Sequence, residues 1–322
     1  MYLSQSYEVR ECPGKGLGCF ATKKINIGTT ILRETPLIKR TAEHFHRDWR
    51  EVWTQFQALR KEDQIKYCSL MNKFSTLPET GTTFQHEQID AMKFVTEKLN
   101  VDKEKAKKAM EVLQIYVTNS FPSGVGIKLS RFNHSCGPNA FVVKEGNGVT
   151  IKAMHFIAKG QEITLNYEYK MEKTEMRRNR LFMYWNFVCH CTLCSDEKSD
   201  QDMELLQEVH KKSEELNSNS IRSIENLMAK VECYKKYYHL MKKLKQDVYL
   251  ILTDVIENGY QAAIQGALES QSQPKICKEF KMEAEKFAAV GKKIQNYIYG
   301  VTFPWSERCN VDEYITFLLL QK

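Results

Sequence analysis

The sequence lacks any apolar run long enough to cross a membrane, and its first residues lack the charged and then apolar order of a secretory signal. We therefore expect no membrane partner and a location in the cytoplasm or the nucleus. Thiols stay reduced in these compartments, so the ten cysteines argue against a disulfide framework. Three of them, Cys189, Cys191 and Cys194, fall within six residues, and this crowding instead predicts a metal site.

Clustered arginines with interleaved aromatic residues are also missing, so we expect no direct nucleic-acid specificity. The charge is nevertheless uneven. Residues 1–194 carry 29 Lys and Arg against 20 Asp and Glu, whereas residues 195–322 carry 18 against 20. The basic first part suits an anionic partner in general, and we assign it to the surroundings of a cofactor and a substrate. We expect the chain to be a monomer.

Two further patterns are missing. Gly14, Gly16 and Gly18 do not have the spacing of a dinucleotide-binding fingerprint. We interpret them as a hairpin that lets a ligand approach the backbone closely, with an ordinary tight turn as the alternative. The C-terminal part shows no clear tetratricopeptide consensus.

Apolar residues alternate in two parts of the chain, which is typical of strands with one buried face. The predicted strands lie around residues 7–9, 19–21, 29–34, 141–143, 149–151 and 163–165. Asn147-Gly148 is the expected hairpin turn, because both residues tolerate a positive φ.

Helical spacing dominates between and after these strands. Trp49, Trp53, Phe56 and Leu59 predict one helix, and Asp102 is the expected N-cap of another. The other predicted segments are helices over 87–99, 102–118 and 174–181, a break at 77–81 and a linker over 195–202. From residue 203 on we expect four or five helices of about 15 to 25 residues, with turns at 217–220, 271–274 and 303–304.

Four motifs follow one another in an order that is typical of a known family. They are Gly16-Leu17-Gly18, Asn133-His134-Ser135-Cys136 with Pro138-Asn139, Gly160-Gln161-Glu162-Ile163 with Tyr167, and Cys189-x-Cys191-x-x-Cys194. In these motifs the chain resembles the SET-domain lysine methyltransferases. The Asn119-Ser120-Phe121 segment and the helical C-terminal part make it most similar to the SMYD branch of that family. The resemblance covers about residues 6–194.

The resemblance implies an α+β fold built from three parts. A SET domain of short strands would occupy residues 1–188 with a helical insertion at about 43–118, a zinc-bound post-SET segment residues 189–200, and an all-α domain residues 201–322. SMYD proteins carry a MYND zinc finger inside the SET domain. Residues 40–118 contain only one cysteine, Cys68, so this finger is absent.

The resemblance also implies an activity, the transfer of a methyl group from S-adenosylmethionine to a lysine of a histone or non-histone protein, which leaves S-adenosylhomocysteine. Tyr167 would be catalytic, because its hydroxyl would align the amine. Tyr184, Trp185 and Phe187 would wall the substrate channel, with Trp185 where SMYD enzymes often have a tyrosine. The matches to cofactor-binding positions are Lys15, Gly16, Leu17, Asn119, Ser130, Asn133, His134, Tyr167 and Phe187.

One structural zinc ion belongs to the expected site. Tetrahedral zinc needs four ligands, and Cys189, Cys191 and Cys194 provide three of them. The family takes the fourth from the Asn-His-Ser-Cys motif, which is Cys136 in this chain. His190 is a competing fourth ligand, and reduced cysteines without a metal are the simplest alternative.

Two other interpretations of the chain remain open. The first is a catalytically weak or inactive SET-like scaffold that binds a protein partner through its helical C-terminal domain. The second is a zinc-dependent nucleic-acid binder, which the basic first part suggests and which would show a steep salt dependence.

Overall fold

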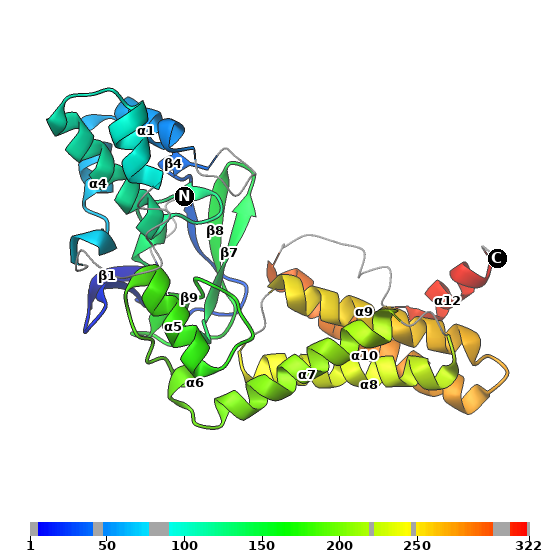
Figure 1. Ribbon diagram of the computed structural model, residues 1–322. Helices are drawn as coiled ribbons and strands as arrows, with labels where there is room; N and C mark the ends of the chain where they lie inside the picture. Colours follow the sequence, from blue (N-terminus) through cyan, green and yellow to red (C-terminus); the bar gives the residue numbers. More distant parts are fainter. Residues whose placement is uncertain are drawn as a thin grey trace. The chain divides into compact units, whose positions relative to one another are not determined.

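A computed structural model describes residues 6–40, 48–76, 90–218, 222–245, 249–298 and 310–320 of the chain. The chain divides into two compact units (Figure 1). The first unit comprises residues 1–167 and 175–189 and contains every described strand. The second comprises residues 168–174 and 190–322, and its described elements are helices.

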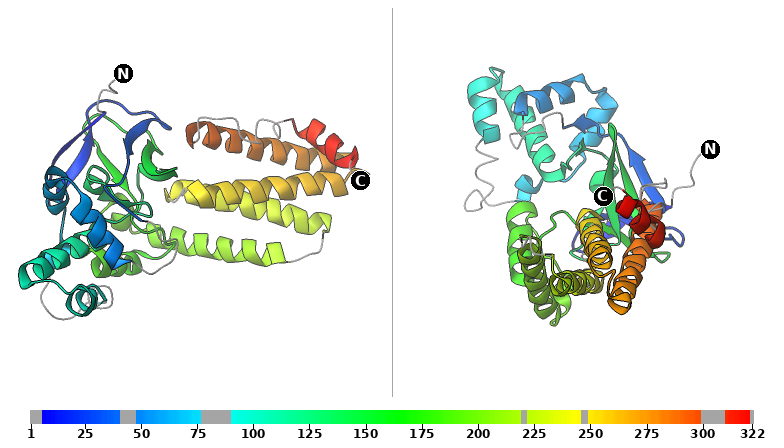
Figure 2. Two further views of the ribbon diagram at one scale, coloured as in Figure 1. Left: turned by 90° about the horizontal axis from the view of Figure 1, so that it is seen from above. Right: turned by 90° about the vertical axis from the view of Figure 1, so that its right-hand side faces the viewer.

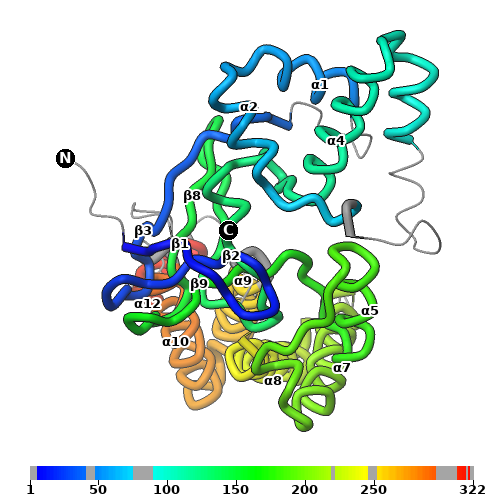
Figure 3. Tube along the Cα trace, turned by 90° about the vertical axis from the view of Figure 1, so that its left-hand side faces the viewer, coloured from blue at the N-terminus to red at the C-terminus, as the bar shows by residue number. Residues whose placement is uncertain are grey.

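The described residues of the first unit form three small sheets. The largest has the order β1 (Tyr7–Cys12), β2 (Gly16–Ala21), β9 (Glu162–Leu165) and β6 (Asn133–His134). The second has the order β3 (Thr30–Glu34), β8 (Gly148–Ala153) and β7 (Ala140–Glu145), and the third pairs β4 (Ile38–Lys39) with β5 (Gly124–Val125). Strand β9 thus lies beside the β1–β2 hairpin, although some 140 residues separate them in sequence (Figure 3).

The observed strands confirm the six predicted ones, but the turn between β7 and β8 differs. Glu145 pairs with Gly148, so the two loop residues are Gly146 and Asn147 rather than Asn147 and Gly148. Gly146 has a φ of +57°, whereas Asn147 has no positive φ. A type II′ turn needs a positive φ only at its first loop residue, where glycine is favoured.

Alternate residues of the strands form the core of the first unit. Apolar and aromatic side chains from both larger sheets and from the segments beside them are fully or almost fully buried, and they include Tyr7, Ile25, Leu32, Phe132, Ile151, Ile163 and Leu165. Burying a large apolar side chain contributes about 1.5–3 kcal/mol relative to exposure. This core fixes the sheet edges from which the polar residues of the motifs project.

The helical insertion packs around a second core, to which Ile38 of β4 and Val125 of β5 also contribute. Its elements are α1 (Trp49–Ala58), α2 (Lys61–Cys68), η1 (Lys73–Thr76), η2 (Phe94–Lys98) and α4 (Lys103–Asn119). Asp102 caps α4 by accepting a hydrogen bond from the Lys105 amide at 2.9 Å, which confirms the predicted N-cap. Helix is present from residue 90 to 98, whereas residues 87–89 and the predicted break at 77–81 lie outside the described residues.

The second unit is built from helices. Its elements are α6 (Thr192–Ser195), α7 (Ser199–Ser218), α8 (Ile224–Lys243), α9 (Tyr249–Glu269), α10 (Pro274–Ile298) and α12 (Val311–Leu320). Consecutive long helices pack side by side, as both views of Figure 2 show. This agrees with the predicted series of helices, and the turn predicted at 303–304 lies outside the described residues. None of the described helices is both long and apolar enough to cross a membrane.

The predicted linker over residues 195–202 is wrong, because α7 already begins at Ser199. Its acidic residues suit a helix start. Asp200 and Asp202 lie in the first turn, where the helix dipole favours negative charge, and Asp202 pairs with Lys243 of α8 at 2.7 Å. Polar composition alone therefore did not distinguish a linker from a helix N-terminus.

Candidate active site

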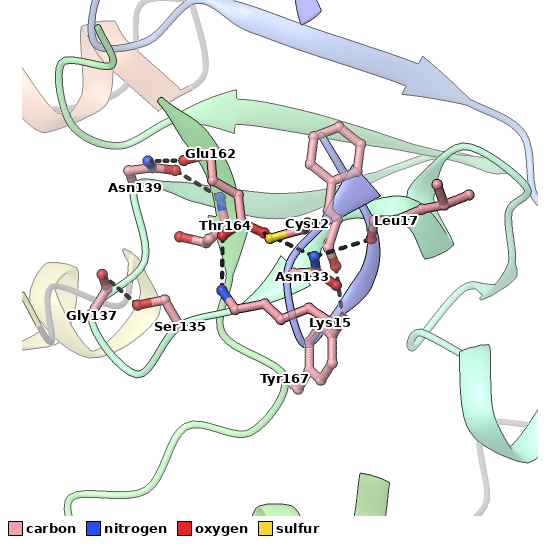
Figure 4. A network of polar contacts seen from close by, with 11 residues as sticks. Cys12, Lys15, Leu17, Asn133, Ser135, Gly137, Asn139, Glu162, Thr164 and Tyr167 are labelled. Carbon is pink, nitrogen blue, oxygen red and sulfur yellow. Dashed lines mark hydrogen bonds and ion pairs between the residues drawn. The ribbon is translucent and has the colours of Figure 1, made fainter. Parts of the chain in front are cut away.

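The site begins with two motifs that a parallel strand pair brings together. Asn133 and His134 of β6 lie opposite Thr164 and Leu165 of β9. Asn139 fastens the segment after β6 to the same strand. Its Oδ1 accepts from the Thr164 amide at 2.9 Å, and its Nδ2 donates to the Glu162 carbonyl at 2.8 Å (Figure 4).

Tyr167 follows the end of β9 and is held at both its hydroxyl and its backbone. The hydroxyl donates to the carbonyl of Phe132 at 2.8 Å, and the amide donates to Nδ1 of His134 at 3.1 Å. Burial raises the pKa of Tyr167 well above its usual range. The hydroxyl therefore stays protonated at neutral pH and keeps a fixed orientation.

Aromatic rings gather around Tyr167. Ring centroids lie 5.2 Å away for His134, 5.4 Å for Trp185 and 6.5 Å for Phe187, and the Phe187 ring is nearly perpendicular to that of Tyr167. Tyr184 packs against Trp185 at 5.7 Å. Trp185 thus contacts both Tyr167 and Tyr184, and the role of these rings as a substrate channel remains a prediction.

The end of α5 (Thr174–Trp185) sets the position of these rings. The helix is four residues longer than the predicted 174–181 segment. Asn186 follows it with a φ of +57°, a left-handed conformation that commonly ends helices. The ammonium of the buried Lys73, in the helical insertion, donates to the carbonyl of Tyr184. Lys73, whose role the sequence did not indicate, therefore links the insertion to the segment that carries Trp185 and Phe187.

Four cysteines converge as the metal prediction requires. The ligand atoms of Cys136, Cys189, Cys191 and Cys194 all lie within 4.8 Å of one another, and the first two sulfurs are 3.9 Å apart. Zinc–sulfur bonds of about 2.3 Å in a tetrahedron place sulfurs roughly 3.8 Å apart. The donor set and its spacing therefore fit a zinc ion, and the competing ligand His190 is exposed and not part of the cluster.

His134 lies between this cluster and Tyr167. The residue is 4% exposed, and its Nε2 lies 3.2 Å from Sγ of Cys136. Because Nδ1 accepts the hydrogen bond of the Tyr167 amide, the ring proton is on Nε2, which donates a hydrogen bond to the sulfur of Cys136. Both ring nitrogens thus have protein partners, which leaves the backbone of His134 as its possible contact to a cofactor.

Six of the predicted cofactor residues fall into two groups by their contacts. Asn133 donates to the carbonyl of Leu17 at 3.1 Å, and Lys15 and Gly16 belong to the same β1–β2 hairpin as Leu17. Asn119 and Ser130 have other partners. Asn119 donates to Met71 and Ile115 at 2.7 and 2.8 Å, and Ser130 donates to Gly126 at 2.7 Å.

Glu162 joins the first group, and sequence reasoning assigned it no role beyond its place in a motif. Its carboxylate accepts from Asn133 at 2.8 Å and pairs with Lys15 at 2.8 Å, while the Cys12 thiol lies 3.5 Å away (Figure 4). Desolvation lowers the pKa of Lys15, but the hydrogen bond and charge of Glu162 outweigh it, so the pKa is raised overall. Burial and the charge of Glu162 raise the pKa of Cys12, so this thiol stays neutral and can donate.

Parts of this sequence are similar to known proteins. The SET-domain profile matches residues 16–168. Histone-lysine N-methyltransferase set5 of Schizosaccharomyces pombe is 29% identical over 203 residues, which are 61% of this chain and 53% of that protein. Histone-lysine N-methyltransferase SMYD3 of Mus musculus is 29% identical over 161 residues, which are 46% of this chain and 38% of that protein. Its human counterpart is 34% identical over 106 residues, or 30% and 25% of the two chains.

Residues 16–168 are therefore a SET domain, and the fold is the α+β architecture of that family followed by an all-α region. Within the class, the chain is similar to proteins named histone-lysine methyltransferases, SMYD3 and set5 among them. The chain spans about half the length of set5 and less of SMYD3. A solved structure described as Rubisco LSMT bound to AdoMet covers 92% of this chain at 13% identity and a TM-score of 0.39, a likeness too weak to add to the assignment.

Proposed function

We propose that the chain is a protein-lysine N-methyltransferase that uses S-adenosylmethionine. The observation that carries the proposal is Tyr167, whose protonated hydroxyl is fixed by the Phe132 carbonyl within a group of aromatic rings. A site of this kind suits an amine that must lose its charge and its water before it reacts. The relatives named histone-lysine methyltransferases support the same activity.

The reaction requires a neutral amine, since an ammonium has no lone pair to attack a methyl group. A free lysine has a pKa of about 10.4, so its deprotonation at neutral pH costs roughly 4–5 kcal/mol. An apolar channel lowers that pKa, because it disfavours the charged form. The rings of Trp185 and Phe187 beside Tyr167 can provide such surroundings without a side-chain base.

Tyr167 would align the amine. Its hydroxyl hydrogen points to Phe132, so the oxygen lone pairs remain available to accept an N–H of the lysine amine. Such a hydrogen bond directs the nitrogen lone pair away from the tyrosine and toward the methyl group. Correct alignment of two reactants can account for several kcal/mol of a barrier.

The cofactor would provide the methyl group on a sulfonium. Lys15, Leu17 and Asn133, which the structure connects, and the backbone of His134 would hold it. Asn119, Ser130, Gly16 and Phe187 remain cofactor-contact predictions. The Cys136 cluster would hold one zinc ion with a structural role, because its four thiolates leave no open coordination position.

The substrate would be a protein that presents a lysine, histone or non-histone, in the nucleus or the cytoplasm. The relatives support a protein substrate. We also propose that the chain is a monomer and has no nucleic-acid specificity. The alternative function is an inactive scaffold, and a single observation favours it, namely Trp185 where related enzymes often have a tyrosine.

The test is transfer of labelled methyl from S-adenosylmethionine to histones and to a cell lysate, with Tyr167→Phe as the paired variant. Tyr167→Phe keeps the ring and removes the hydroxyl, so we expect labelling to fall at least about 100-fold, as for loss of a positioned catalytic group. Cofactor binding, measured by isothermal titration, should change little. A wild-type chain that neither labels protein nor binds the cofactor would support the scaffold.

A further inference from the structure

Glu162 occupies a position that the predicted catalytic steps do not use. It lies on β9, opposite Phe20 of β2, and its side chain is 17% exposed. One carboxylate oxygen, Oε1, accepts from Asn133, and the other, Oε2, pairs with Lys15 (Figure 4). A single carboxylate thus holds the two residues that come from β6 and from the β1–β2 turn.

The contact to Glu162 fixes which way the Asn133 amide faces. A side-chain amide has two N–H donors on nitrogen and an acceptor on oxygen. Both acceptors near Nδ2, the Leu17 carbonyl at 3.1 Å and the Glu162 carboxylate at 2.8 Å, lack hydrogens. A flipped amide would place its oxygen against two other oxygens, so the observed orientation is strongly preferred.

Gly18 makes this close approach possible. A Cβ at this position would lie 2.8 Å from Nδ2 of Asn133, closer than real side-chain atoms approach, and 3.0 Å from Oε1 of Glu162, which is a tight contact. The hydrogen of glycine leaves room for the amide and the carboxylate to meet. Gly18 of the first motif therefore leaves the space in which Asn133 of the second motif and Glu162 of the third motif meet.

With these contacts made, Asn133 still offers a hydrogen-bond acceptor to a ligand and Lys15 still offers donors. Oδ1 of Asn133 has no hydrogen-bond donor among the described residues and remains an acceptor. Lys15 stays 46% exposed, and an ammonium has three donors, of which Glu162 takes one. An acceptor and a cation side by side suit a zwitterion, with its ammonium toward Asn133 and its carboxylate toward Lys15.

We propose that Glu162 is a positioning residue that sets Asn133 and Lys15 for the zwitterionic amino-acid end of the nucleoside cofactor. The inference rests on the proposed function and names the part of the ligand that this corner recognises. A nucleoside thioether without the amino-acid end should not depend on Glu162. A residue that only supports the fold would affect both ligands equally.

The experiment compares two ligands by isothermal titration, S-adenosylhomocysteine and 5′-methylthioadenosine, which lacks the amino-acid end. Glu162→Gln keeps the shape but removes the charge, so one oxygen must serve both Asn133 and Lys15. We expect S-adenosylhomocysteine to bind about tenfold more weakly, which is about 1.4 kcal/mol, and 5′-methylthioadenosine to change less than about twofold. Glu162→Asp, which keeps the charge with a shorter reach, should fall between wild type and Glu162→Gln.

Glu8→Gln is the matched control. Glu8 lies on β1 of the same hairpin, is exposed and pairs with Arg10 at 3.4 Å, so its loss should leave both affinities unchanged. Equal weakening of both ligands by the Glu162 variants, or no weakening of either, would overturn the inference. If the folded wild-type chain binds neither ligand, the proposed function fails first. Should Glu162→Gln not fold, the ratio of the two affinities in Glu162→Asp decides alone.

Discussion

The interactions that stabilise the interior of each unit differ in kind. In the strand-rich unit, single polar side chains connect segments far apart in sequence, as Glu162 connects with Lys15 and Asn139 with Thr164. In the helical unit, the long helices pack mainly through apolar faces, where Gly259 and Gly266 of α9 lie directly against Phe287 and Phe280 of α10.

This difference shows how each unit responds to change. A hydrogen-bonded side chain has few replacements, because its loss leaves buried partners without a bond. A packed helix face tolerates many apolar residues of similar volume. The first unit should therefore lose stability through polar substitutions and the second through changes of volume.

Loss of the metal should have the largest effect. Cys136→Ser removes one of four thiols in the cluster, and structural zinc contributes about 10–16 kcal/mol of binding free energy in small peptides. We expect less than about half the wild-type zinc content and a loss of cooperative unfolding of the strand-rich unit, measured by metal analysis and calorimetry. Cys233→Ser, in α8 and outside the cluster, should keep its zinc, and unchanged zinc in Cys136→Ser would rule out the assigned ligand.

Asn139→Ala should have the next largest effect. The variant leaves the buried Thr164 amide without its acceptor and the Glu162 carbonyl without its donor, so we expect a loss of about 2–3 kcal/mol in the free energy of unfolding. Denaturant titration measures it. Asn258→Ala is the counterpart in the helical unit, where an exposed amide donates to Asp254 of its own helix at 2.8 Å, and it should stay within about 0.5 kcal/mol of wild type. Equal losses in the two variants would remove the contrast between the units.

Gly266→Ala should have the smallest effect and tests the helical unit by volume. Alanine is the better helix former by about 1 kcal/mol, but its Cβ would lie 2.3 Å from Cε1 of Phe280. Overpacking costs about 1–3 kcal/mol, so we expect a net loss of about 1 kcal/mol. Phe280→Leu in the same chain should recover part of it, as a double-mutant cycle would show. A Gly266→Ala chain more stable than wild type would mean that the helices shift apart freely.

Much of the fold could be predicted because local patterns and local structure agree. The alternation of apolar residues located the strands, helical spacing located α1 and α4, and Asp102 marked a helix start. The failures have local causes as well. Gly146 rather than Gly148 takes the positive φ, and the acidic residues after Ser199 start a helix.

The site could be predicted only as a set of motifs. The convergence of four cysteines followed from the family resemblance, and the structure brings their sulfurs together. Glu162 and Lys73 could not be assigned roles, since the partners of Glu162 are 29 and 147 residues away and the partner of Lys73 is 111 residues away. Such pairings depend on tertiary packing, which no periodicity in the sequence encodes.

The contact between Lys15 and Glu162 also has a consequence for how the chain folds. Contacts that span 147 residues form late, because a long loop must close before they contribute. At a synthesis rate of about 5–20 residues per second, the β1–β2 hairpin would emerge roughly 7–30 s before β9. During that interval the helical insertion can fold, because its core is separate from that of the two larger sheets. A nascent chain that has not yet reached Glu162 can therefore fold its insertion but lacks the contact that joins Lys15 to Glu162.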